Sequence, residues 1–229
     1  MPKVNWNLWK NVSLLLISFT CLFFSSCSKP SDDSYSAELG YDYFPNVEGS
    51  FKEYAVDSTH YGITQEDFSF FLREEITESF IDGEGQTAMR VERSKRNNPN
   101  EDWVLTDVWT QKRTTTSAQR FEENRRFIRL IFPITEEKTW DGNAYNDLDE
   151  WTHSYLAIDE AYTIDSLDFG ETVTIEQRNN VNLVDQEEAS EVYARSIGLI
   201  YKYFKDLNFQ EGQVTGVEME MKLVSYGGL

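Results

Sequence analysis

The sequence predicts a mainly β protein, a single antiparallel domain folded as a barrel or a strongly curved sheet. From residue 41 onward, apolar and polar residues alternate with a period of two through much of the chain. Clusters of turn residues separate these runs, and few segments have helical spacing, so few helices are expected to cover a flat sheet. A two-sheet β-sandwich is the alternative, since it also joins antiparallel strands by short turns.

The clearest strand lies near the C-terminus. Apolar side chains alternate with glutamate and lysine over residues 217–223, which predicts a strand with one buried face. Residues 70–76 and 89–92 bracket a turn signal at Asp82-Gly83, and these two runs form the best hairpin candidate. Further strands are expected at 51–57, 103–110, 126–132, 171–177 and 198–206.

Residues 187–197 fit either a helix or a strand. Apolar residues recur there at helical spacing, and Asp185 and Gly198 are suitable residues for its two ends. The same stretch also fits a strand, a tight turn at Gly198 and a further strand. We favour this second interpretation because it continues the series of hairpins. The composition of residues 97–101 and 141–150 predicts loops.

The N-terminus has the features of a bacterial lipoprotein signal peptide. Two lysines precede an apolar run over residues 12–24, which is shorter than the roughly 20 residues that a transmembrane helix needs. Ser25 and Ser26 then stand directly before Cys27, as at the end of a lipobox. We therefore expect cleavage before Cys27 and acyl chains, such as palmitate, that anchor the protein to the membrane through this residue.

Three parts follow from this pattern: a signal peptide over residues 1–26, a flexible tether over 27–40 and a β-rich domain over 41–229. The tether is polar and aperiodic, which is typical of a flexible linker. Its Lys29, Asp32 and Asp33 resemble the charged export signal of surface lipoproteins of Bacteroidota. We expect an outer-membrane location, with the cell surface favoured over a periplasm-facing orientation.

Charge and cysteine content exclude several classes of function. The chain has 40 acidic and 21 basic residues and a net charge of −19. Such a field repels phosphate, so a nucleic-acid partner is not expected, and attachment to anionic lipid must come from the anchor. The two cysteines are Cys21, in the leader, and Cys27. The mature domain therefore has neither a disulfide nor a thiolate metal site.

No catalytic residues can be nominated from the sequence. Only two histidines occur, His60 and His153, and we expect both at the surface without a chemical task. The motifs of serine hydrolases and zinc proteases are missing from the sequence. Glycoside hydrolysis needs two facing carboxylates, but among 40 acidic residues no pair stands out. An enzyme is therefore not the favoured interpretation.

Residues 140–151 form the most acidic loop. Calcium binds six to eight oxygens of such loops, although the spacing of an EF-hand is not matched here. The favoured interpretation is a solvated loop pinned by Trp140 and Trp151, and no other cofactor is expected. The candidate calcium ligands are Asp141, Asn143, Asp147 and Asp149.

Aromatic residues supply the remaining candidates for binding. Most aromatic residues on strands are core residues, but some can line a concave face that accepts sugars, lipids or peptide side chains. A basic cluster at Arg125, Arg126 and Arg129 is expected to neutralise the neighbouring Glu122 and Glu123. The aromatic candidates are Tyr41, Tyr43, Phe44, Tyr54, Trp103, Trp109, Tyr201, Tyr203 and Phe204.

Three stretches, residues 41–54, 126–146 and 193–202, resemble uncharacterised lipoproteins of Bacteroidota. In these proteins a Tyr-Phe-Pro opening precedes the first strand, and a Gly-Leu-Ile/Val-Tyr-Lys segment lies near the end. Phe51 and Ser196 depart from the pattern, where an aromatic Trp or Tyr and a Gly are expected. The resemblance implies location and a β-rich domain, and it carries no catalytic residues.

The leading functional hypothesis is a lipid-anchored, non-catalytic domain that binds a ligand, a protein or a carbohydrate. One alternative is a glycosidase-like surface hydrolase that uses paired carboxylates. A second is a lipocalin-like carrier of an apolar ligand, which predicts a closed cavity lined by Val217, Met219, Met221 and Leu223.

The anchor can be tested at its attachment residue. In a Cys27→Ala variant we expect no incorporation of labelled palmitate and release of the protein from the membrane fraction, because the thiol is the acceptor of the acyl chains. Persistence of the variant in membranes would contradict the predicted anchor.

Overall fold

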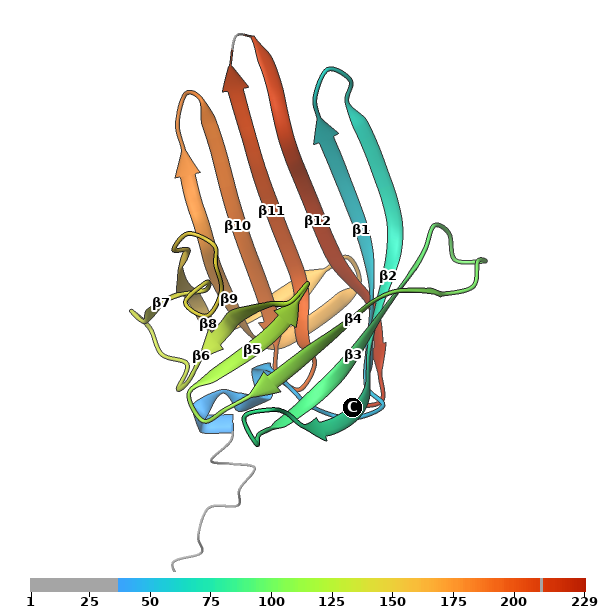
Figure 1. The fold of residues 1–229 in the computed structure, drawn as a ribbon, viewed down its shortest axis with the longest axis vertical. Helices are drawn as coiled ribbons and strands as arrows, with labels where there is room; N and C mark the ends of the chain where they lie inside the picture. Colours follow the sequence, from blue (N-terminus) through green and yellow to red (C-terminus); the bar gives the residue numbers. More distant parts are fainter. Residues whose placement is uncertain (1–36, 211) are drawn as a thin grey trace, which may run out of the picture. The chain divides into compact units, whose positions relative to one another are not determined.

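A computed structural model describes residues 37–210 and 212–229. The predicted signal peptide, Cys27 and most of the predicted tether lie outside the described residues. Within the described part, all strands pair antiparallel in one twelve-stranded sheet with the order β6-β5-β4-β3-β2-β1-β12-β11-β10-β9-β8-β7 (Figure 1). The sheet curls into a nearly closed barrel, which confirms the predicted fold class over the sandwich alternative.

A 3₁₀ turn precedes the strands. Consecutive strands pair with one another except β6 and β7, which are the two edges of the sheet, and β1 also pairs with β12. The elements are η1 (Tyr41–Tyr43), β1 (Phe51–Tyr61), β2 (Glu66–Ile81), β3 (Thr87–Arg96), β4 (Val104–Arg113), β5 (Ser117–Glu122), β6 (Arg125–Ile131), β7 (Thr139–Asp141), β8 (Thr152–Ile164), β9 (Leu167–Val181), β10 (Asp185–Ala194), β11 (Gly198–Gln210) and β12 (Gln213–Gly227).

Every predicted strand overlaps an observed one, and 103–110 and 126–132 each extend one residue beyond it, whereas β5, β7 and β8 were not predicted. The ambiguous stretch 187–197 forms a strand and then a turn, and the next strand begins at Gly198, which confirms the favoured interpretation. Gly198 (φ +90°) and Ser196 (φ +62°) both take left-handed conformations in this turn. Glycine adopts this conformation without steric cost, which explains why glycine is expected at position 196 in the resembling lipoproteins.

The barrel closes where its two edge strands, β6 and β7, meet. The Ile128 amide donates a 2.9 Å hydrogen bond to the carbonyl of Gly142, and the Trp140 indole donates one of 3.1 Å to the carbonyl of Ile128. An isolated bridge between Arg126 and Tyr145 continues the contact. These bonds satisfy part of the exposed edges, which would otherwise attract another strand.

Alternation along each strand separates the barrel interior from its outer face. On β1, Lys52, Tyr54 and Val56 are buried, while the residues between them are more exposed. The Tyr54 side chain is fully buried, and its hydroxyl donates a 2.9 Å hydrogen bond to the carbonyl of Leu199. Successive side chains of a strand point to opposite faces, so a period-two sequence produces this interior directly.

Three hairpins, β1–β2, β9–β10 and β11–β12, are longer than the strands β3–β6, and their outer halves extend beyond the rest of the sheet (Figure 1). We call these outer halves the fingers. Their tips lie at the upper end of the domain in Figure 1, whereas η1 lies at the lower end. The chain therefore enters the domain at the end opposite the finger tips. No helical segment of the described residues has the length and apolar character that crossing a membrane requires.

The pairing of β11 with β12 depends on a glycine. Gly216 has φ +129°, and a Cβ at this position would lie 1.9 Å from the carbonyl oxygen of Asp206. We expect Gly216→Ala to lower the free energy of unfolding by about 2 kcal/mol. Gly83→Ala is the matched control, because a Cβ there has open space around it. Urea denaturation measures both, and equal stability of the two variants would contradict the prediction.

Candidate functional site

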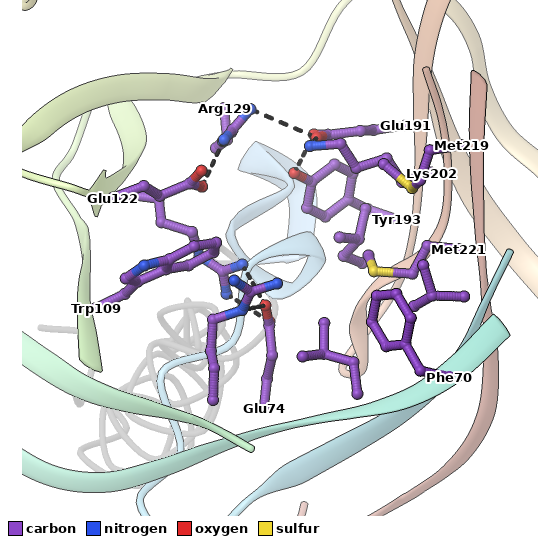
Figure 2. Close-up of a pocket in the computed structure, with 15 residues that line it drawn as sticks. Phe70, Glu74, Trp109, Glu122, Arg129, Glu191, Tyr193, Lys202, Met219 and Met221 are labelled. Atoms are coloured by element: carbon purple, nitrogen blue, oxygen red, sulfur yellow. Dashed lines mark hydrogen bonds and ion pairs between the residues drawn. The ribbon is translucent and has the colours of Figure 1, made fainter. Parts of the chain in front are cut away.

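The barrel interior contains a hollow of about 180 Å³, which we call the inner hollow (Figure 2). Strands from both halves of the sheet contribute to it, so residues far apart in the sequence meet there. Its lining residues are Val56, Phe70, Leu72, Glu74, Arg93, Trp109, Arg120, Glu122, Arg129, Glu191, Tyr193, Leu199, Lys202, Met219 and Met221.

Glu74 of β2 is the centre of a first group of charges. Its carboxylate accepts hydrogen bonds of 2.9 Å from Arg120 Nη2 and 3.1 Å from Arg93 Nε. Arg120 also donates a 3.1 Å hydrogen bond to the side-chain oxygen of Gln111. Glu74 is only 3% exposed, so this ion pair is almost completely removed from water.

Glu191 of β10 is the centre of a second group. The carboxylate lies 3.2 Å from Lys202 Nζ and 3.5 Å from Arg129 Nη1, and it accepts a 2.6 Å hydrogen bond from the hydroxyl of Tyr193. Arg129 also pairs with Glu122, a partner expected from the sequence. Figure 2 shows how Arg129 connects Glu122 to Glu191 across the hollow.

The basic neighbours keep both buried glutamates ionised. Burial alone would raise the pKa of Glu74, but attraction by Arg120, Arg93 and Lys52 outweighs it and lowers the pKa to about 2. Burial likewise opposes ionisation of Glu191, yet Arg129 and Lys202 hold its pKa below the usual range. The same balance of burial against Arg129 lowers the pKa of Glu122. These carboxylates are therefore fixed negative charges near neutral pH.

Another part of the lining of the inner hollow is apolar. Phe70, Met219 and Met221 lie next to one another in Figure 2, with Met219 beside Lys202, and aliphatic side chains complete this wall. Met219 is only partly buried, which leaves it available for contact. A hollow lined partly by fixed charges and partly by a thioether and aliphatic wall can bind a molecule that has both polar and apolar parts.

Of these charged residues, the sequence singled out only Arg129 and Glu122, although a signal was also present for Glu74. Glu74 stands between Leu72 and Ile76 in the alternation, which places a carboxylate on the buried face of β2. Such a position requires a basic partner, but the sequence does not show that Arg120 of β5 supplies it. Of the aromatic candidates, only Trp109 lines the inner hollow. Tyr43, Phe44 and Tyr54 belong to the core, and Tyr193 and Phe70 were missed.

The acidic loop is held closed by its own hydrogen bonds. Asp141 Oδ1 accepts bonds of 2.9 Å from the amides of Asn143 and Trp151, and the Asn143 side chain donates to the carbonyl of Asp149. Asp147 pairs with Arg125. In the described part of the chain, no three acidic, histidine or cysteine side chains converge as a metal site would require. The arrangement supports the pinned loop, and calcium binding stays an untested prediction.

The expectation of two surface histidines is wrong for His153. This side chain is 4% exposed and lies against Trp140 and Trp151, and burial lowers its pKa to about 4. Its burial has a steric reason, since the ring lies directly over Gly142, where a Cβ would collide with it. His60 is exposed and packs against Phe68 on the neighbouring strand.

Comparison with known proteins gives only remote similarities. No protein-family model matches the chain, and no curated protein matches it. A crystal structure described as a putative lipoprotein from Parabacteroides distasonis ATCC 8503 is 12% identical, with a TM-score of 0.40, over 81% of this chain and 98% of that chain. A putative exported protein with a YmcC-like fold from Bacteroides fragilis NCTC 9343 is 9% identical, with a TM-score of 0.38, over 80% and 98%. These values are too low to define a family or a function for this chain.

The contribution of the ion pairs of Glu74 to the stability of the fold can be measured by neutralising this residue. We expect Glu74→Gln to lower the free energy of unfolding by about 3–5 kcal/mol, because Arg120 and Arg93 would be left buried without their counter-charge. Glu75→Gln is the matched control. Glu75 is the next residue of β2, with a side chain 39% exposed and paired with Arg73, so about 1 kcal/mol or less is expected. Similar losses of unfolding free energy in both variants would contradict a stabilising role of the buried ion pairs of Glu74.

The same pair should make stability depend on pH. The pKa of Glu74 is 4.5 in its ordinary state and about 2 in the fold. Its ionised form therefore stabilises the folded state fully above pH 4.5, and this stabilisation is lost as the pH falls toward 2. Chemical denaturation across this range should show a smaller decline for Glu74→Gln than for the unmodified protein.

Proposed function

We propose that this domain is a non-catalytic binding module, held at the outer membrane by a lipid on Cys27, and that it binds a small ligand in the inner hollow. The observation that carries the proposal is the pairing of fixed charges with an apolar wall in one hollow. Ligand sites of proteins commonly combine an apolar lining with a few positioned polar groups.

The ionised state of the buried carboxylates argues against the alternative of a glycosidase-like hydrolase. Glycoside hydrolysis needs one carboxyl group that is protonated near neutral pH, which requires a raised pKa. In the inner hollow, basic neighbours lower the pKa of Glu74, Glu122 and Glu191 instead. These three groups are suited to holding charges in place and unsuited to donating a proton to a leaving group.

The lining also differs from that of a carrier for a wholly apolar molecule. Of the four predicted positions, Met219 and Met221 line the inner hollow, whereas Val217 and Leu223 do not. Seven charged side chains share the same lining. Desolvating such groups against hydrocarbon alone is unfavourable, so a ligand with a polar part is a better match.

The position of η1 supports display at a surface. The described chain begins just before η1, at the end of the domain opposite the finger tips (Figure 1). A domain attached there can direct its fingers away from the bilayer, toward ligands in the surrounding medium. Cell-surface exposure is part of the proposal, and the charged residues Lys29, Asp32 and Asp33 of the tether favour it over a periplasm-facing orientation.

A neutral fluorescent probe tests the binding site. We expect N-phenyl-1-naphthylamine, whose emission rises in apolar surroundings, to bind the protein saturably. Met219→Lys should weaken binding about tenfold, because it places a charge on the apolar wall. Val224→Lys is the control, since this residue of β12 is 38% exposed and outside the lining. Two results would contradict the proposal: equal binding by both variants, or a hydrolytic activity that Glu74→Gln or Glu191→Gln abolishes.

A further inference from the structure

The inner hollow continues into a second hollow between the fingers. This space of about 280 Å³, which we call the upper groove, shares Val56, Phe70 and Met219 with the inner hollow. Together the two spaces fall in the range of roughly 300–1,000 Å³ that is usual for small-molecule sites. The remaining residues that line the upper groove are Ser58, His60, Phe68 and Lys95.

The two ends of this continuous site differ in polarity. The inner hollow holds the buried ion pairs, whereas the lining of the upper groove contains no carboxylate. Phe68, near the tip of the β1–β2 finger, is 42% exposed although it is large and apolar. Exposed apolar surface of this kind next to a hollow is typical of a binding site.

Basic groups outnumber acidic ones in and around the inner hollow. Arg93, Arg120, Arg129 and Lys202 line it together with only three glutamates. Lys52 lies beside Arg120 in an adjoining small pocket and is itself 9% exposed. Within residues 37–210 and 212–229, neither Lys52 nor Lys95 forms an ion pair. Arg93 also lies 3.6 Å from Asp107, so four carboxylates balance the four cations of the hollow, and the positive surplus beside the site in this part of the chain comes from Lys52 and Lys95.

The apolar wall is better suited to an aliphatic chain than to a sugar ring. Sugars bind by stacking on open aromatic faces. Here the guanidinium of Arg93 lies 3.6 Å from the ring centre of Trp109, and the ammonium of Lys95 lies 3.8 Å from that of Phe70. Cations therefore already occupy a face of both rings. Apart from Tyr193 and Phe68, the rest of the apolar lining consists of methionine, leucine and valine side chains, which adapt to a flexible chain.

We propose that the ligand is a single-chain amphiphile with an anionic head group, whose head lies beside Lys202 and Arg93 and whose aliphatic tail runs past Met219 to Phe68. Lys202 and Arg93 are the more accessible cations of the inner hollow, with side chains 23% and 18% exposed. This inference rests on the proposed function, because it specifies the ligand of the same site.

Three probes separate the head group from the tail in calorimetric titrations below the micelle concentration. Dodecanoate should bind at least about tenfold more tightly than dodecyltrimethylammonium, which has the same tail and the opposite charge. Butanoate, with the same head and almost no tail, should show no detectable binding. Equal affinity for both twelve-carbon probes would overturn the anionic head while leaving the binding module intact.

Two pairs of variants locate the head and the tail. Lys202→Gln should weaken dodecanoate binding about tenfold. Lys205→Gln is the control and should leave binding unchanged, because Lys205 lies on the other face of the same strand, where it pairs with Glu218. Phe68→Ser should weaken binding several-fold, whereas Phe80→Ser should not, since Phe80 is 37% exposed on the same strand but outside the groove. Circular dichroism confirms folding of each variant. Unchanged binding in both Lys202→Gln and Phe68→Ser would overturn the site.

The outcome also separates this inference from the proposed function. Binding of N-phenyl-1-naphthylamine without binding of dodecanoate would overturn the amphiphile and retain the binding module. Failure of both probes to bind would overturn both proposals.

Discussion

The structure depends on the ionic contacts inside the barrel, above all those of Glu74 with Arg120 and of Glu191 with Arg129. Removing such charges from water costs several kcal/mol for each ion, and only close, hydrogen-bonded partners offset that cost. Each partner comes from a different strand, so the curvature of the sheet and the position of these charges determine one another. A flatter sheet would separate β2 from β5 and leave Glu74 without its counter-charge.

The same contacts account for the character of the inner hollow. The ion pairs supply seven of the fifteen residues that line the hollow, and the remaining residues are apolar or aromatic. Because the basic side chains hold the glutamates ionised, the hollow offers fixed charges rather than a proton donor. The residues of the ion pairs therefore both stabilise the fold and line the proposed ligand site.

Much of the fold could be predicted because half-buried strands have a period-two signature, as in β1 and β12. The strand β5 was missed because Ser117, Gln119 and Arg120 are polar yet buried, which reverses the usual pattern. The strand β8 was missed because register shifts interrupt its alternation around Asp159. The site itself could not be predicted, since a charged residue on a strand is ordinarily solvated. Glu74 and Glu191, each between two buried apolar residues of its strand, were the signals that the interior is charged.

The most direct test of the central claim is a ¹³C NMR titration of the glutamate side-chain carboxyl groups, with the signals of Glu74 and Glu191 assigned by Gln substitution. The account predicts that both signals stay at the ionised position as the pH falls through 4.5, the ordinary pKa of a glutamate, and that Glu74 changes only near pH 2. A titration of either buried group at or above the ordinary value would contradict the account, because it would mean that the basic side chains do not neutralise the charges inside the barrel.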